Sequence, residues 1–138
     1  MTTTSSTQTN ERLVEDWARL CSSHDLDGLM QLFTEDVVYE DVTLGAVNRG
    51  KDAVRAFAAE FFSRFPDVTI ELSSNFATPT QGGAEWVMRG IQAGDSAQAA
   101  APSQRFALRG ASILGFANGR ICRVADYWDR AKFLEQLG

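Results

Sequence analysis

The pattern of apolar and polar positions divides the chain into a helical first half and a second half rich in strands. Apolar residues recur at helical spacing from residue 11, and again after Asp25, a residue type that caps helices. The clearest helical pattern covers residues 51–65 and is followed by Pro66, which cannot continue a helix. The apolar stripe of this helix consists of Val54, Phe57, Ala58, Phe61 and Phe65. We therefore predict three helices before the strand-rich half.

Alternation of apolar and polar residues predicts the strands. They are expected over residues 37–42, 68–76, 84–93, 104–117 and 120–129. Residues 43–50 are expected to form a loop, Asn118-Gly119 a tight hairpin turn, and the last eight residues a short helix. Helices segregated from an antiparallel sheet are typical of an α+β fold. We expect a cone in which a curved antiparallel sheet wraps around the N-terminal helices, with a pocket between them.

Composition and charge narrow the class of protein. The polar run MTTTSSTQTN predicts a disordered tail over residues 1–10, followed by one domain over residues 11–138. A net charge of −5 without a basic patch argues against a nucleic-acid partner. No apolar run approaches the length of a membrane span, so no membrane partner is expected. The N-terminal run has neither a basic nor an apolar region of a signal peptide, so a cytoplasmic location is expected. A single histidine and two isolated cysteines predict no metal site.

An acid in the last predicted strand is the sharpest chemical feature. In RVADYWD, residues 123–129, Asp126 shares a face with Val124 and Trp128 at a period of two, and with Cys122 further back. A carboxyl group facing a dry cavity can hold a proton near neutral pH and donate it, because burial disfavours its charged form. The alternative is a structural carboxylate that caps a loop or pairs with an arginine. Asp126 is therefore our first candidate for a general acid or base.

Two further candidates lie on the strand predicted over residues 37–42. Asp41 ends this strand and shares a face with Tyr39, whose hydroxyl could orient a substrate. The alternatives are an aspartate that caps a turn and an ordinary core tyrosine. Asp41 is expected as a second acid or base, or as a positioning group.

Large apolar residues are expected to line the pocket and to bind a hydrophobic substrate rather than a sugar or a nucleotide. The predicted lining consists of Trp17, Phe57, Phe61, Trp86, Met88, Leu108 and Trp128. Simple core packing is the alternative for each of them. The opposite sheet face is expected to carry an apolar strip that forms a homodimer interface. This strip consists of Ala107, Ala111, Ile113, Ile121, Ala125 and Tyr127.

Three stretches carry a family resemblance: LFTEDVVYEDVTLG, RGKDAVRAF and RGASILGFANGRICRVADYWD. Over roughly residues 11–137 the chain resembles the SnoaL-like branch of the nuclear-transport-factor-2-like superfamily. That superfamily includes polyketide cyclases, ketosteroid isomerases, limonene-type epoxide hydrolases and non-catalytic binders. The resemblance implies a cone-shaped α+β fold and an activity that needs no cofactor.

The resemblance also assigns positions. Asp126 matches the acid in the last strand of limonene-type epoxide hydrolases, and Asp41 matches the catalytic base of ketosteroid isomerases. Trp86 and Met88 stand where the epoxide hydrolases place an arginine and an aspartate that help to activate water. The SnoaL-like cyclases need chiefly one aspartate facing a shaped apolar pocket, which fits this chain best.

Three hypotheses of function follow. The first is a cofactor-independent cyclase or isomerase of a hydrophobic, oxygen-bearing small molecule, polyketide-like or terpenoid-like, with Asp126, Asp41 and Tyr39 as its catalytic residues. The second is an epoxide hydrolase of the limonene type with altered water activation. The third is a small-molecule-binding or dimerisation module without catalysis.

Overall fold

The computed structural model describes residues 6–92 and 104–137. Its helices are α1 (Ser6–Ser23), α2 (Leu26–Gln31), α3 (Lys51–Arg64) and α4 (Arg130–Leu137). Its strands are β1 (Phe33–Asp41), β2 (Ala46–Arg49), β3 (Thr69–Ala77), β4 (Gln81–Gln92), β5 (Gln104–Ala117) and β6 (Arg120–Trp128). The run of small residues GDSAQAAAPS predicts a further loop over residues 94–103, which lies outside the described residues.

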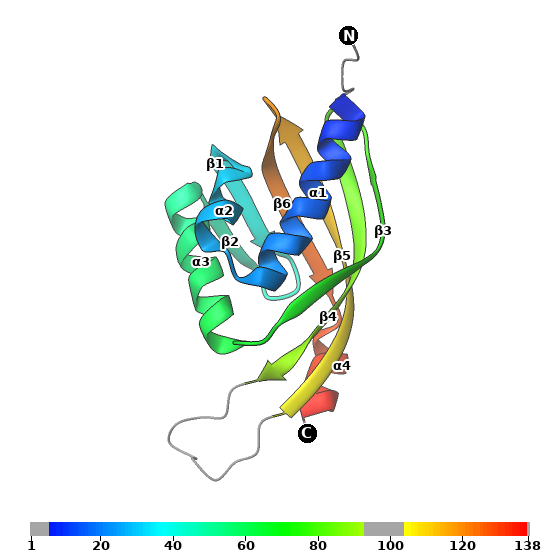
Figure 1. Ribbon diagram of the computed structural model, residues 1–138. Helices are drawn as coiled ribbons and strands as arrows, with labels where there is room; N and C mark the ends of the chain where they lie inside the picture. The colour runs from blue at the N-terminus through cyan, green and yellow to red at the C-terminus, as the bar shows by residue number, and fades with distance from the viewer. Residues whose placement is uncertain (1–5, 93–103, 138) are drawn as a thin grey trace.

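One six-stranded sheet organises the molecule, in the order β2-β1-β6-β5-β4-β3. Figure 1 shows this sheet bending around the helices, with α1 crossing its inner face and α4 beside its lower end. α1 packs mainly on β3, α3 on β1 and β2, and α4 on β5. The predicted α+β class is confirmed. The sheet is mixed rather than wholly antiparallel, because β1 and β6 run parallel.

Local sequence signals account for several element boundaries. The Asp25 side chain caps α2 by accepting a hydrogen bond from the Gly28 N–H at 3.0 Å. Asn118 and Gly119 both have positive φ, of 55° and 74°, as a tight hairpin turn requires. Asp129 accepts a hydrogen bond from the Lys132 N–H at 3.0 Å and so caps α4.

Two predicted boundaries differ from the structure. The first helix begins at Ser6, so residues 6–10 are helical rather than part of a tail. Asn10 is buried there and donates hydrogen bonds to the carbonyl oxygens of Thr78 and Pro79. Part of the predicted 43–50 loop forms the edge strand β2, which the pairing with β1 stabilises. In both places the hydrogen-bond partners come from another segment of the chain, so the local pattern of residues does not predict the element.

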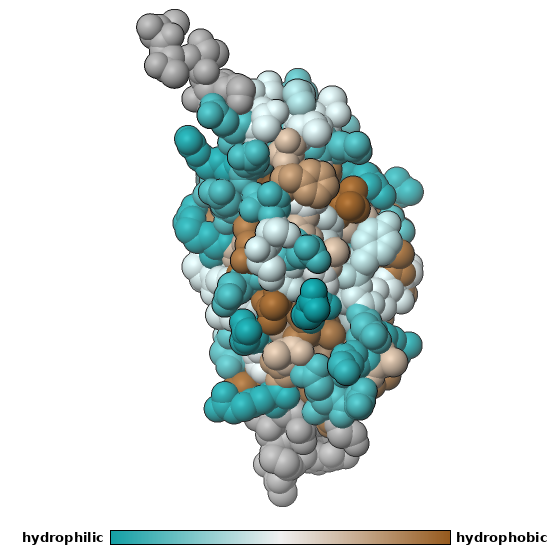
Figure 2. All heavy atoms as spheres, turned by 90° about the vertical axis from the view of Figure 1, so that its right-hand side faces the viewer, coloured by the Kyte–Doolittle hydropathy of each residue, from teal (hydrophilic) through white to brown (hydrophobic). Residues whose placement is uncertain are grey.

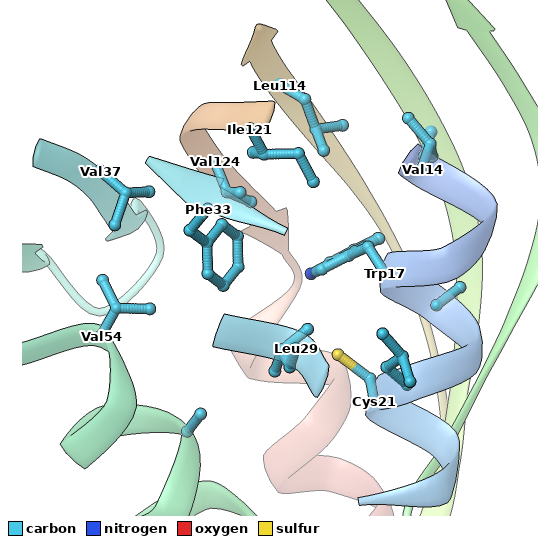
Figure 3. Packing of buried hydrophobic residues seen from close by; sticks show 14 of the residues in the cluster. Val14, Trp17, Cys21, Leu29, Phe33, Val37, Val54, Leu114, Ile121 and Val124 are labelled. Atoms are coloured by element: carbon cyan, nitrogen blue, oxygen red, sulfur yellow. The ribbon is translucent and has the colours of Figure 1, made fainter. Parts of the chain in front are cut away.

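The main core lies between the sheet and the helices. Figure 3 shows Trp17 and Cys21 of α1 facing Phe33 of β1 and Val124 of β6. These residues belong to one cluster of buried apolar side chains. A second cluster, around Phe65 and Phe106, joins the end of α3 to β5 and α4. Two apolar clusters therefore cover most of the inner face of the sheet.

A bulge changes the faces of two residues in β6. Gly115 pairs with Arg123, and Phe116 pairs with Ile121, so that Cys122 is the extra residue. Ile121 consequently turns into the core and is 0% exposed, which makes its prediction for the outer strip wrong. Cys122 was predicted to share the inner face with Asp126. As the extra residue of the bulge it is out of the alternation that places Val124 and Asp126 on that face, so this prediction is wrong.

The outer face of the sheet has no described helix packed across its centre. Figure 2 shows the side of the molecule on which β3, β4 and β5 lie, with brown apolar groups among teal hydrophilic ones. Ile113 and Tyr127 are 40% and 45% exposed, as expected for the outer strip, and Phe76 adds a third large apolar side chain. Ala125, also predicted for this strip, is fully covered.

Candidate active site

A cavity of about 620 Å³ lies between the inner face of the sheet and helices α1, α3 and α4. This size is within the range of roughly 300–1,000 Å³ that is typical of ligand pockets. All ten residues that the sequence proposed for a pocket line this one cavity, namely Trp17, Tyr39, Asp41, Phe57, Phe61, Trp86, Met88, Leu108, Asp126 and Trp128. Their roles in catalysis or binding stay predictions.

The parallel pairing of β1 and β6 brings the two candidate acids together. Asp41 is in register with Asp126, and Tyr39 is in register with Val124. Residues in register on neighbouring strands point to the same face of a sheet. The two carboxyl groups therefore stand side by side at the wall of one cavity.

A chain of two hydrogen bonds, buried at Trp86 and Ser112, supports Asp126. Trp86 Nε1 donates to Ser112 Oγ at 2.9 Å, and Ser112 Oγ donates to Asp126 Oδ1 at 2.6 Å. The Trp86 ring reaches Ser112 by lying over Gly110, where a Cβ would overlap the indole. Because Trp86 occupies an acceptor site of the hydroxyl, the single Ser112 proton is directed at Asp126.

The surroundings hold Asp126 near its titration midpoint at neutral pH. Burial raises the pKa of its carboxyl group to about 7, hydrogen bonds from Ser112 and Tyr39 oppose the rise, and the nearby Asp41 carboxylate adds to it. Burial, followed by the charge of Asp126, raises the pKa of Tyr39 well above its usual value. Asp126 can therefore exist in either protonation state at pH 7, whereas Tyr39 keeps its proton.

Asp41 has a different environment. It is 8% exposed, and Trp128 Nε1 donates to its Oδ1 and Oδ2 at 3.1 Å each. The Leu44 N–H donates to Oδ1 at 3.0 Å, so Asp41 also caps the turn after β1. Both oxygens of this carboxylate are engaged by N–H donors. The arrangement suits a side chain that fixes the position of Trp128.

The hydrogen bond from Ser112 to Asp126 and the contribution of α4 to the cavity were not predicted from the sequence. Ser112 carries the hydrogen bond to Asp126, and its inward position is visible in the alternation Leu108, Gly110, Ser112, Leu114. A small polar residue in an otherwise apolar face was the available signal. The α4 residues Phe133, Leu134 and Leu137 also line the cavity. No local signal indicates this, because it depends on where α4 packs.

Other candidate groups lie elsewhere or serve the fold. His24 Nε2 is 3.0 Å from the Val68 carbonyl oxygen, and its ring stacks on Phe62 at 4.5 Å, so it holds the turn after α1. Burial raises the pKa of the cavity-lining Cys21 thiol far above its usual value, which makes it unreactive.

Among residues 6–92 and 104–137, no group of three or more His, Cys, Asp or Glu is arranged to hold a metal ion. Within the same ranges no helix has the length and hydropathy of a membrane span.

Ser112→Ala is expected to raise the pKa of Asp126 above about 7. The Ser112 hydroxyl stabilises the charged carboxylate by its hydrogen bond, and alanine removes that stabilisation. A pH titration of the aspartate side-chain carbons by ¹³C NMR measures this shift. Ser74→Ala is the matched control, since the Ser74 hydroxyl donates to the exposed Glu85 carboxylate at 3.0 Å. A lower pKa of Asp126 in Ser112→Ala would contradict the assignment of Ser112 as donor.

Comparisons with known proteins agree with this architecture. The profile of the SnoaL-like domain family matches residues 14–124. A candidate polyketide cyclase from Xanthomonas campestris pv. campestris has 23% identity and a TM-score of 0.83, with 97% of this chain and 100% of that chain covered. An LEH-like epoxide hydrolase from M. tuberculosis has 19% identity and a TM-score of 0.81, with 98% and 89% covered. A candidate polyketide cyclase from Silicibacter sp. has 26% identity and a TM-score of 0.78, with 96% and 97% covered.

No curated protein matches the chain at a significant level. The family match and the shared fold confirm the resemblance seen in the sequence. Sequence identities of 19–26% support a shared fold but do not identify the reaction, which depends on the residues of the site.

Proposed function

Because the chain belongs to the SnoaL-like domain family, we propose that it is a cofactor-independent acid–base enzyme that cyclises or isomerises a hydrophobic, oxygen-bearing small molecule, polyketide-like or terpenoid-like, in this cavity. The observation that carries the proposal is Asp126, a carboxyl group with a pKa of about 7 at an apolar cavity wall. A group that titrates near the working pH can both accept and return a proton.

The proposed step starts from the Asp126 carboxylate. It removes a proton from a carbon next to a substrate carbonyl, and the electron pair of the C–H bond moves to the carbonyl oxygen to form an enolate. In an isomerisation the substrate also has a carbon–carbon double bond next to that carbon, so the enolate is a conjugated dienolate. The Asp126 carboxylic acid returns the proton to the far carbon of the dienolate, and the double bond moves into conjugation with the re-formed carbonyl group. In a cyclisation the enolate carbon bonds to a second carbonyl carbon of the same molecule, and the new alkoxide takes the proton from Asp126. Neither route needs an oxidant, a reductant or a second substrate.

The apolar walls contribute in two ways. They exclude water, which strengthens electrostatic interactions with Asp126. They also hold a flexible molecule in a folded shape, and such orientation can supply a large part of a rate enhancement. In this proposal Tyr39 bonds to Asp126, and Asp41 acts as a positioning group that fixes Trp128 and adds negative charge beside Asp126.

Proton exchange at carbon tests the proposal without knowledge of the natural substrate. The protein is incubated with 2-decalone, an apolar ketone, in D₂O, and deuterium uptake next to the carbonyl is followed by mass spectrometry. Uptake well above the buffer rate is expected. Uptake equal to the buffer rate for 2-decalone and a panel of apolar ketones would contradict the proposal.

Epoxide hydrolysis stays the second candidate, because a protonated Asp126 could also donate to an epoxide oxygen. Asp41 has both oxygens bonded to N–H groups and is poorly placed to activate a water. Racemic epoxides in oxygen-18 water distinguish the reactions. Labelled diol would indicate hydrolysis, an unlabelled cyclic ether would indicate cyclisation, and binding without any product would favour a non-catalytic module.

We also propose a homodimer through the outer sheet face. Phe76, Ile113 and Tyr127 expose large apolar surface there, and exposed apolar patches often mark interfaces. Light scattering at micromolar concentration is expected to give twice the mass of one chain. Ile113→Lys combined with Tyr127→Lys is expected to give a folded monomer, whereas a wild-type monomer would contradict the proposal.

A further inference from the structure

A glycine on the cavity side of β5 stands between two tryptophans. Gly110 pairs with Trp86 of β4 on one side and with Trp128 of β6 on the other. Residues directly opposite each other on neighbouring strands point to the same face of a sheet, and both tryptophans line the cavity. Gly110 therefore belongs to the cavity wall, two residues along β5 from the Ser112 that pairs with Asp126.

The backbone at Gly110 does not itself require a glycine. Its φ lies outside the positive range that Gly45, Gly50 and Gly119 adopt. A glycine inside a strand often marks a place where another group approaches closely. Here that group is the Trp86 ring, because a Cβ at position 110 would lie 2.6 Å from its Cζ2 and Cζ3 atoms. The ring, and not the backbone, therefore explains why this position has no side chain.

The seat on Gly110 determines where the Trp86 ring lies. The ring is buried, and its Nε1 donates to Ser112 Oγ at 2.9 Å, so it extends across Gly110 along β5. Carbon atoms in contact lie about 3.5–4 Å apart, so a methyl group at position 110 would displace the ring by roughly 1 Å. Because the sheet lies behind the ring, this displacement narrows the cavity.

We propose that Gly110 sets the size of the molecules that the cavity accepts, by letting the Trp86 ring lie against the sheet and keeping the space beside Asp126 open for ligands with several fused rings. Fused carbon rings bury more apolar surface against such a wall than a single ring does. The cavity volume of about 620 Å³ is large enough for ligands of this class. The inference rests on the proposed function, because it concerns an apolar substrate that must reach Asp126.

Ketones of different size test the role of Gly110. Cyclohexanone has one ring and perhydroanthracen-2-one has three fused rings, and each carries one ring carbonyl group. Gly110→Ala is expected to weaken binding of the three-ring ketone about tenfold, the order of cost of overpacking a filled site, and to leave cyclohexanone binding within about twofold. Titrations followed by NMR of the protein measure both affinities.

The matched control is Gly83→Ala, on the opposite face of the sheet. A Cβ at Gly83 would lie 2.6 Å from Phe76 Cε1, so this variant also places a methyl group against an aromatic ring of the neighbouring strand. Phe76 is exposed and lies outside the cavity lining, so both affinities are expected to equal those of the wild type. The ¹⁵N-labelled indole signal of Trp86 is expected to move in Gly110→Ala and to stay in place in Gly83→Ala.

A second pair of variants decides the matter if Gly110→Ala does not fold. Trp86→Leu leaves no ring to displace, so adding Gly110→Ala to it is expected to leave binding of the three-ring ketone unchanged. A loss of binding in this double variant would show that the methyl group acts without Trp86, which overturns the inference.

Three further outcomes also overturn the inference. They are an equal loss of both ketones in Gly110→Ala, no loss of either, and a wild type that binds the three-ring ketone no more tightly than cyclohexanone. All these readouts are affinities and do not depend on turnover. A protein that binds the ketones as expected but exchanges no proton would therefore refute the proposed function alone.

Discussion

Asp126→Asn is expected to lower deuterium exchange into 2-decalone by about 10²–10⁴-fold, the usual contribution of one acid–base group. Asparagine keeps the shape of the side chain and an oxygen that can accept the Ser112 hydrogen bond, so the cavity wall is preserved. It cannot take up a proton at neutral pH. Rates measured by mass spectrometry at saturating ketone give the ratio.

The matched control is Asp129→Asn, the same chemical change three residues further along. Asp129 is exposed and caps α4, and asparagine is an equally good cap. Its exchange rate is expected to equal that of the wild type. Activity of Asp126→Asn within threefold of the wild type would remove Asp126 from the mechanism.

The second large effect concerns stability. Asp126→Asn is expected to raise the free energy of unfolding by about 4 kcal/mol at pH 8 and to have little effect at pH 4. The raised pKa means that the folded state resists ionisation of Asp126, whereas the unfolded chain ionises it near its ordinary value of 3.8. The wild type therefore loses stability as the pH rises from about 4 to about 7, and the loss levels off above pH 7. Asparagine does not ionise, so the Asp126→Asn protein does not lose this part of its stability as the pH rises.

Urea unfolding of both proteins between pH 4 and pH 8 measures the difference at each pH. The two curves are expected to lie close together at pH 4 and to separate until about pH 7. Asp129→Asn again serves as the control and should follow the wild type. An Asp126→Asn protein that is less stable than the wild type at pH 8 would show that the native fold favours the carboxylate.

Much of the fold followed from short-range pattern. The periodicity over residues 51–65 predicted α3 almost to its ends, and Asn118-Gly119 predicted the β5–β6 turn, because helix spacing and turn conformation depend on neighbouring residues. A period of two likewise placed Asp126 on an inner face. The same rule misplaced Ile121, since a bulge shifts the register by one residue and only the pairing of β5 with β6 creates that bulge.

The sequence by itself determined that this chain has an acid among apolar residues in its last strand, an aromatic lining, and the motifs of its family. Only the tertiary structure decided how those groups meet. The parallel pairing that sets Asp41 beside Asp126 joins strands about 85 residues apart in the chain. The Trp86–Ser112 bond likewise depends on a contact between distant elements. The physical reason is that protonation and hydrogen bonding respond to distances of a few ångströms in space, whereas sequence pattern reports neighbours along the chain.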